Sequence, residues 1–260
     1  MIGFNRLGKN GRFGNQMFQY AALKGIAKNR GYDFCIPSGP RSKDDLYDSQ
    51  NQHELFIAFN LDCKIVDQFN APYVQESSFT FDNNLFQNCQ DNVNIHGFFQ
   101  TKKYFKNIED EIRNDFTFKN DIINPCKESF DGNDYIGLHI RRTDYVGKQN
   151  YHPLCTLDYY ERALKKLPDV PVIIVSDDPD WCGNQNLFKS DRFLISDSDN
   201  NIIDMCILSL CKYHIIANSS FSWWGAWLSN SVKVIAPKIW YGSAANLDDR
   251  DIVPENWERI

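Results

Sequence analysis

Two adjacent arginines at the end of an apolar run give the strongest chemical signal in this sequence. The run 135–140 is typical of a buried strand, and it leads into the segment 139–144, HIRRTD. Guanidinium groups at such a place are costly to desolvate unless an anion pairs with them. Strand alternation directs Arg141 and Arg142 to opposite faces. One of them can then bind a diphosphate bidentately, while Asp144 or another carboxylate holds the other. A buried network of structural ion pairs is the alternative interpretation.

Four more side chains complete a candidate nucleotide site. His139 shares the face of Arg141 and is better suited to hydrogen bonding than to general base catalysis. Asp177 and Asp178 follow an apolar run at 172–175, and Asp204 lies in a segment with helical spacing. A carboxylate can accept two hydrogen bonds from N1 and N2 of guanine, which distinguishes guanine from adenine.

A cluster of serines begins a predicted short helix after the strand expected at 214–217. Ser219, Ser220, Phe221 and Ser222 stand at its start. Hydroxyl groups and free backbone amides at a helix N-terminus form a favourable site for phosphate. We therefore expect this segment to contact the same diphosphate.

A glycine-containing turn precedes the first predicted helix, at about 15–29. The spacing over 8–14 is G-x-x-G-x-x-G, which is neither the dinucleotide-binding nor the P-loop pattern. A structural turn is therefore the simpler interpretation. Gly14 leaves room for a ligand, and Asn15 with Gln16 supplies neutral amide donors at the helix start.

Two aspartate pairs spell D-x-D, a spacing found in metal-dependent sugar transferases. They are the segments 178–180 and 197–199. The arginine pair already supplies the positive charge that a metal ion would give, so we assign no metal ligands. A metal-dependent sugar transferase is the alternative, and it would lose its activity in EDTA, whereas a metal-independent enzyme would keep it.

Apolar runs alternate with helical spacing through the C-terminal half. We expect strands at 135–140, 172–175, 214–217 and 232–236, and helices at 157–167, capped by Thr156, and around 203–210. This order is typical of a parallel α/β sheet, whose ligands bind beyond the carboxyl ends of its strands.

The N-terminal half is less regular. A strand at 2–7 and a helix at 104–112 are expected, residues 35–95 carry no placed element, and 117–134 is expected to be a domain junction. The predicted domains are 1–125 and 130–260, with the cleft between them as the default site. The tryptophans at 223, 224 and 227 are expected to pack in the core.

Composition excludes several classes of protein. The chain has 260 residues, a formal charge of −6 and 42% hydrophobic residues, so it is globular and is not expected to bind nucleic acid. We find neither a membrane-spanning segment nor a secretory leader, which favours a cytoplasmic protein, with peripheral attachment to a membrane left open. The eight cysteines lack C-x-x-C spacing and are expected to be reduced, packed thiols.

Taken together, the motifs resemble one family. The segment 11–21 (GRFGNQMFQYA) is similar to the N-terminal signature of the α-1,2-fucosyltransferases, glycosyltransferase family 11. The segment 139–146 (HIRRTDYV) resembles a motif that this family shares in part with α-1,6- and protein O-fucosyltransferases. The segments 157–160, 176–178 and 218–228 follow in the family's order.

The resemblance implies a GT-B fold of two Rossmann-like domains facing across a cleft, the first one small and irregular. It implies that 1–125 is the acceptor-side domain and that 130–260 binds the GDP-sugar. It further implies GDP-β-L-fucose as donor, a glycan acceptor, inversion at the anomeric carbon and no required cofactor or divalent metal. Arg141 would contact the β-phosphate, and Asn15 would lie near fucose or the bridging phosphate. His139 and Asp204 would lie near guanine, and the segment 219–222 around the diphosphate.

The sequence leaves the acceptor and its base open. Gln149 stands where the α-1,6 relatives have a glutamate, and an amide cannot take up a proton as a carboxylate does. Asp144 is the candidate for the base that deprotonates the acceptor. We expect transfer of fucose to O2 of a β-galactoside. The alternatives are another linkage, the metal-dependent transferase and a non-catalytic glycan-binding protein. Animal members carry a Golgi anchor, so its absence favours a bacterial or viral source.

Overall fold

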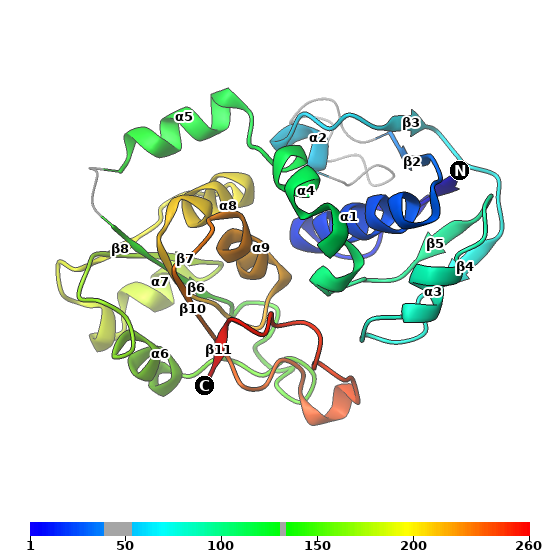
Figure 1. The fold of residues 1–260 in the computed structure, drawn as a ribbon. Coiled ribbons are helices and arrows are strands. Elements are labelled where there is room, and N and C mark those ends of the chain that lie inside the picture. The colour runs from blue at the N-terminus through cyan, green and yellow to red at the C-terminus, as the bar shows by residue number, and fades with distance from the viewer. Residues whose placement is uncertain (39–53, 131–133) are drawn as a thin grey trace. The chain divides into compact units, whose positions relative to one another are not determined.

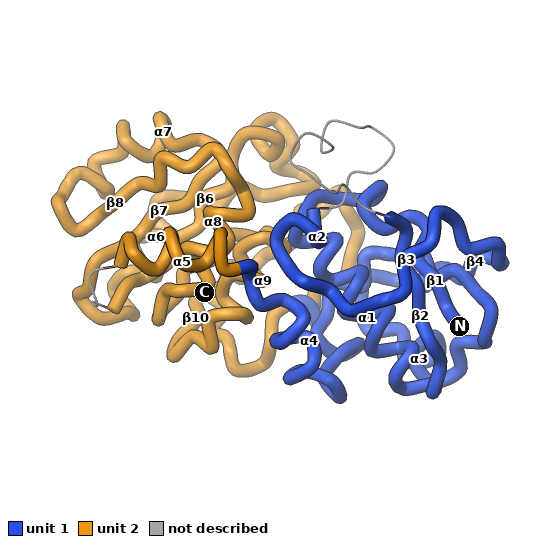
Figure 2. Tube along the Cα trace, turned by 90° about the horizontal axis from the view of Figure 1, so that it is seen from above, with its two compact units in different colours: residues 1–119, 250–252 blue, residues 120–249, 253–260 orange. Residues whose placement is uncertain are grey.

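The computed structural model describes residues 1–38, 54–130 and 134–260, and these residues form two compact units. Unit 1 comprises 1–119 with 250–252, and unit 2 comprises 120–249 with 253–260 (Figure 2). The predicted domains 1–125 and 130–260 differ from this division in two places. Helix α5 (Asn120–Glu128) belongs to unit 2, and a short piece near the C-terminus returns to unit 1.

Unit 1 contains a parallel sheet in the order β3-β2-β1-β5-β4 (Figure 1). Its strands are β1 (Ile2–Gly3), β2 (Phe34–Pro37), β3 (Lys64–Val66), β4 (Tyr73–Gln75) and β5 (Asn94–His96). The expected strand at 2–7 is shorter than predicted, because the chain turns at once and the amide of Leu7 donates to the carbonyl of Phe4. The unplaced region 35–95 supplies four of these strands, although residues 39–53 lie outside the described residues.

Helix α1 (Phe13–Arg30) is the main helix of unit 1, and the predicted helix at 15–29 is confirmed. It ends at Gly31, whose φ of 69° lies in the left-handed region that favours glycine. Shorter helices are α2 (Leu55–Ala58), α3 (Asn83–Asn88) and α4 (Glu109–Asp115). The single helix expected at 104–112 is wrong. Two 3₁₀ turns, η2 (Lys102–Tyr104) and η3 (Lys106–Ile108), precede α4 instead.

Unit 2 contains a six-stranded parallel sheet in the order β11-β10-β9-β6-β7-β8. The strands are β6 (Ile136–Ile140), β7 (Val172–Ser176), β8 (Phe193–Ile195), β9 (Tyr213–Ile215), β10 (Lys233–Ala236) and β11 (Glu258–Arg259). The four predicted strands in this half are confirmed within one or two residues at their ends. Every residue of β6 is buried, as expected for a central strand covered on both faces.

The helices of unit 2 are α5, α6 (Leu157–Leu164), α7 (Pro179–Gly183), α8 (Asn201–Leu210) and α9 (Ser220–Leu228), with 3₁₀ turns η4 (Asn186–Phe188) and η5 (Ser243–Ala245). The predicted cap is confirmed, since the Thr156 hydroxyl accepts from the amide of Tyr159 at 3.2 Å. The boundary between the two units, at 119/120, falls within the expected domain junction 117–134, and α5, which begins at that boundary, packs against α8.

The two faces of β6 contact different helices. Ile136, Leu138 and Ile140 belong to one apolar cluster with α6, whereas a Cβ placed on Gly137 would meet Leu208 of α8 at 2.9 Å. His139 therefore faces α8 and α9. The core on that side includes the tryptophans at 223, 224 and 227, which are buried as expected. All eight cysteines are free, and six of them are buried.

Candidate active site

The candidate site of unit 2 lies where the chain reverses its direction across the sheet. From β6 the chain builds β7 and β8 on one side, then returns to build β9, β10 and β11 on the other. The carboxyl ends of β6 and β9 therefore meet at a topological switch point, where loops diverge and leave room for a ligand. The arginine turn follows β6, and the serine cluster follows β9.

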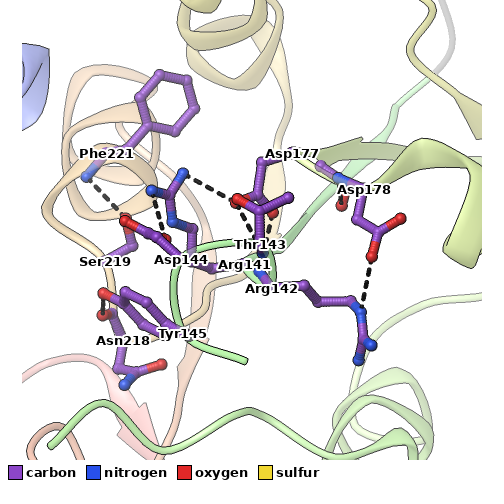
Figure 3. Close-up of polar contacts among 11 residues, drawn as sticks. Arg141, Arg142, Thr143, Asp144, Tyr145, Asp177, Asp178, Asn218, Ser219 and Phe221 are labelled. Carbon is purple, nitrogen blue, oxygen red and sulfur yellow. Dashed lines mark hydrogen bonds and ion pairs between the residues drawn. The ribbon is translucent and has the colours of Figure 1, made fainter. Parts of the chain in front are cut away.

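Arg141 is held by two carboxylates. Its Nη2 lies 2.7 Å from Oδ1 of Asp144, and its Nη1 lies 3.1 Å from Oδ2 of Asp177. The guanidinium carbon lies 5.6 Å from the ring centre of Tyr145, within reach of a cation–π interaction. The side chain keeps 16% of its surface exposed. Arg141 is therefore oriented on two sides and still reachable by a ligand (Figure 3).

Arg142 takes a different direction, as strand alternation predicts. Its Nε pairs with Oδ2 of Asp178 at 3.1 Å, and its guanidinium carbon lies 3.9 Å from the ring centre of Trp181 on α7. Figure 3 shows it extending away from Arg141. A guanidinium engaged by a carboxylate and an indole ring is positioned to stabilise the turn. Sequence reasoning missed Trp181 as its partner.

Asp177 and Asp178 shape the arginine turn. Asp177 accepts the backbone amides of Arg142 and Thr143 at 2.8 and 3.2 Å, in addition to pairing with Arg141. Asp178 caps α7 by accepting the amide of Trp181. Both are predicted from the sequence to contact the nucleotide, whereas their contacts in the structure are with the turn and α7. Contact with guanine stays a prediction for either one.

The cluster carries more negative than positive formal charge. Two guanidinium groups face three carboxylates, those of Asp144, Asp177 and Asp178. A dianionic diphosphate can bind only if one carboxylate yields its place or if other donors help. Asp144 is the most exposed of the three, with 39% of its side chain accessible, against 19% and 31%. It is the carboxylate that a ligand can most readily replace.

Helix α9 supplies such donors. Ser219 is its N-cap, and the amide of Phe221 donates to its hydroxyl oxygen at 3.3 Å. The first amides of a helix have no partner within the helix and carry its positive dipole end. Ser219, Ser220 and Phe221 are partly exposed, so this turn is open to an anion.

Ser222 does not fit the predicted role of its side chain. It is buried, and its hydroxyl donates towards the carbonyls of Ala217 and Ser219 at 3.3 Å. These hydrogen bonds link the start of α9 to the segment just after β9, so the hydroxyl is already engaged with the backbone. Beside it, the Tyr145 hydroxyl donates to the carbonyl of Asn218 at 3.1 Å, which ties the arginine turn to the serine cluster (Figure 3).

His139 is buried and uncharged at neutral pH. Burial, helped by the positive charge of Arg141, lowers its pKa to about 3. Its Nδ1 has no hydrogen-bond partner among the described residues, and its ring lies 5.3 Å from that of Phe221. A neutral imidazole with an unused nitrogen can bind a ligand by one hydrogen bond, but it is a poor proton acceptor at this pKa.

Asp204 lies in the first turn of α8 and is 9% exposed. The Ser196 hydroxyl donates to its Oδ1 at 2.7 Å. Burial raises its pKa to about 6, and the negative charges of Asp197 and Asp199 add to the effect. Burying this carboxylate lowers the folding stability of the protein, which suggests a function for it. It can accept a pair of hydrogen bonds, such as those from the guanine edge.

The predicted residues of unit 1 gather at the start of α1. Gly14 lies in its first turn and is buried. The Asn15 Oδ1 accepts a 2.6 Å hydrogen bond from Nε2 of Gln100, and Gln16 accepts the amide of Glu54 at 2.8 Å. Gly11 has a φ of 92°, so the preceding turn uses the conformational freedom of glycine. Sequence reasoning missed Gln100, since nothing in its local pattern predicts a contact 85 residues away.

The D-x-D segments form no recognisable cation site. Among the described residues no group of three histidine, cysteine or acidic side chains is placed to hold a metal ion. An open groove of unit 2 lies elsewhere, between the segment 153–162 and the chain after β10. None of the predicted site residues lines it. No described helix is both long enough and apolar enough to cross a bilayer.

Comparison with known proteins decides the family. The sequence model of "Glycosyl transferase family 11" matches residues 1–260. This chain belongs to glycosyltransferase family 11. As a family 11 enzyme it transfers a sugar, and the resemblance drawn from the motifs at 11–21, 139–146 and 218–228 is confirmed.

Named relatives of this family 11 enzyme differ in the sugar they transfer. An α-1,2-colitosyltransferase of Escherichia coli is 33% identical, and the alignment covers 96% of both chains. The O-antigen biosynthesis glycosyltransferase WbnK of the same species is 28% identical over 89% of this chain and 93% of that one. A galactoside α-(1,2)-fucosyltransferase of Bos taurus is 24% identical over 84% of this chain and 64% of the relative.

Solved structures confirm the fold. The fucosyltransferase NodZ from Bradyrhizobium matches with a TM-score of 0.57 at 16% identity, covering 90% of this chain and 93% of that one. POFUT1 in complex with GDP-fucose matches with a TM-score of 0.58 at 11% identity, covering 100% and 97%. The family 11 chain has the GT-B-like α/β architecture that the resemblance implies.

Proposed function

We propose that this enzyme transfers L-fucose from GDP-β-L-fucose to O2 of a β-galactoside, with inversion at the anomeric carbon. The proposal rests mainly on how Arg141 is oriented, exposed and located. It is oriented by Asp144 and Asp177, partly exposed, and located at the sheet's switch point beside the start of α9. Fucosyltransferase relatives and neighbours solved with GDP-fucose support this choice of donor.

Arg141 would stabilise the leaving group. Breaking the bond between fucose and the β-phosphate leaves negative charge on GDP, and a fixed guanidinium in a poorly hydrated site lowers that barrier by several kcal/mol. The diphosphate would replace Asp144 on Arg141, while Asp177 continues to hold the guanidinium from the other side. The backbone amides at the start of α9 would supply the remaining donors, with that of Phe221 released from the Ser219 hydroxyl.

The base moiety would be recognised by two buried groups. His139 offers an unused nitrogen beside Phe221, and Asp204 can accept from N1 and N2 of guanine. Both groups cost folding stability, because each is a polar side chain withdrawn from water. Ligand binding would compensate for that cost.

The base that deprotonates the acceptor stays unassigned. Gln149 is exposed and cannot act as a carboxylate base. Asp144 is paired with Arg141 at 2.7 Å, which favours a role in orienting that arginine. An inverting transfer with strong leaving-group stabilisation can proceed with little assistance at the incoming hydroxyl, so the proposal does not depend on a base.

Colitosyl transfer is the second candidate, and the 33% identical E. coli relative favours it. Colitose is fucose without its 3-hydroxyl group, so both donors would share the GDP site described above. The two differ in one contact near C3 of the sugar. A site built to hydrogen-bond that hydroxyl rejects the analogue that lacks it.

The deciding experiment measures transfer from GDP-L-fucose and GDP-L-colitose to a panel of glycans, with the linkage of the product determined by NMR. We expect higher kcat/KM with GDP-L-fucose and a product fucosylated at O2 of a terminal β-galactose. Preference for GDP-L-colitose would replace the proposed donor. Transfer only to other sugars, or at another hydroxyl, would refute the proposed acceptor.

A further inference from the structure

The loop from His96 to Gln100 in unit 1 has a strained backbone. It begins at the last residue of β5, and Phe99 within it has a φ of 53°, in the left-handed region. That conformation is rare for a bulky side chain and costs free energy. The surroundings enforce it, since the Phe99 ring is fully buried and packs edge-on against Tyr104 at 5.1 Å.

A buried carboxylate holds this loop in place. One oxygen of Glu76, Oε2, accepts the backbone amides of both Phe98 and Phe99, at 3.0 and 2.9 Å. The other oxygen accepts the Tyr104 hydroxyl at 3.1 Å. Burial raises the pKa of Glu76 to about 7, so keeping it costs stability. Strain and a buried acid together indicate a loop whose shape serves a function.

The side chains that this loop presents are neutral and polar or aromatic. The His96 Nε2 lies 2.6 Å from Nδ2 of Asn10, and Gln100 binds Asn15. Phe98 stacks on Phe79 with ring centres 5.4 Å apart and an angle of 25°, and both rings are partly exposed. Amides, an imidazole and an exposed aromatic face match a ligand rich in hydroxyl groups.

The loop also has the position of a ligand site. In unit 1 the chain runs from β1 outward to β2 and β3, then builds β4 and β5 on the other side of β1. The carboxyl ends of β1 and β5 thus form the switch point of this sheet. His96 stands at the carboxyl end of β5, and Asn10 lies in the turn that follows β1.

We propose that the loop His96–Gln100 binds the acceptor glycan of this enzyme. Phe98 would lie against a sugar ring, and His96 with Asn10 would hydrogen-bond to its hydroxyls, while Glu76 acts as a positioning residue behind the loop. The assignment rests on the proposed function, because it takes the acceptor to be a glycan. The side chains of the loop itself carry no positive charge, and Arg6, whose charge helps burial to lower the pKa of His96, is exposed to solvent. A diphosphate therefore fits less well here.

The test compares acceptor and donor kinetics in the full-length enzyme. The acceptor is the glycan that the wild type uses best in the panel described above. We expect His96→Ala and Phe98→Ala each to raise the acceptor KM by about tenfold, the size of one or two lost contacts. The KM for GDP-fucose and the increase in Tm caused by GDP should change by less than about twofold.

Matched variants separate binding from folding. Tyr32→Ala removes a partly exposed aromatic of the same unit just beyond the end of α1, and it should leave both KM values unchanged. His96→Gln keeps a hydrogen-bonding side chain and should restore much of the acceptor affinity. If His96→Ala fails to fold, Phe98→Ala still decides the question, because its ring is partly exposed.

The outcomes distinguish this inference from the proposed function. Folded His96 and Phe98 variants with wild-type acceptor KM would overturn the role of the loop, whichever glycan the enzyme uses. So would a rise in the donor KM alone. A wild type that uses no β-galactoside would refute the proposed acceptor, and the loop would then be tested with the glycan that it does use.

Discussion

Replacing Arg141 with lysine should lower kcat by about 100-fold. The guanidinium uses two different nitrogens for two carboxylates, Nη2 for Asp144 at 2.7 Å and Nη1 for Asp177 at 3.1 Å. The ammonium group of lysine keeps the positive charge but has one nitrogen, so it cannot hold Asp177 and a phosphate oxygen with the same geometry.

The magnitude follows from the contact that is lost. A hydrogen bond to a charged group contributes roughly 1.5–3 kcal/mol, and the low exposure of Arg141 places it towards the upper part of that range. A loss of about 2.7 kcal/mol that applies to the transition state corresponds to about 100-fold in rate. The effect falls on kcat because charge on the diphosphate increases as the glycosidic bond breaks.

The assay measures GDP release under saturating donor and acceptor, with Tm as a check on folding. Arg162→Lys is a matched control, since this arginine of α6 is half exposed and pairs with Asp158 at 2.9 Å. It should retain wild-type kcat. A kcat near the wild-type value in Arg141→Lys would refute leaving-group stabilisation by this residue. A rise in KM alone would show that Arg141 binds the ground state and the transition state equally.

Three further perturbations test the same site. Asp204→Asn should raise the Tm of the ligand-free enzyme at pH 7.5 by about 3 °C and by less at pH 4.5, measured by thermal unfolding. The Tm should rise because the folded-state pKa of Asp204, about 6, lies above the ordinary value of 3.8. The wild type therefore loses stability as the pH rises through that interval, and the asparagine does not. The same variant should weaken GDP binding at least about tenfold, and an unchanged Kd would remove Asp204 from guanine recognition. Asp144→Asn should tighten GDP binding in calorimetry, because the diphosphate no longer competes with a carboxylate for Arg141; weaker binding would instead show that Asp144 orients the arginine for the ligand. Transfer activity should persist in excess EDTA, and its loss with recovery on adding Mn²⁺ or Mg²⁺ would favour the metal-dependent alternative.

Local sequence patterns predicted much of unit 2. The strand β6 and the helix α6 have apolar spacing that matches their burial, and Thr156 caps α6 as its position predicts. Such elements depend on neighbours along the chain, whose spacing can be read directly. Alternation after β6 also predicted that Arg141 and Arg142 would point to different partners.

Unit 1 was harder to predict because its strands are short. β1 has two residues, and β3, β4 and β5 have three each, too few to show a period. Their pairing brings together segments far apart in the sequence, such as Gly3 with Asn94. The series of 3₁₀ turns before α4 illustrates the same limit, because apolar spacing alone does not distinguish one helix from several short turns.

The sequence by itself determined the family and the parallel α/β organisation of unit 2, and it supplied the residues proposed to bind a diphosphate, because these follow from residue types and from spacing along the chain. Only the tertiary structure decided which carboxylate holds which arginine, that Ser222 is committed to the backbone, and that Glu76 fixes a strained loop carrying His96 and Phe98. The longer-range arginine contacts and those of Glu76 join residues 22 to 36 positions apart, and the role of Ser222 depends on its burial; both are set by how the elements pack.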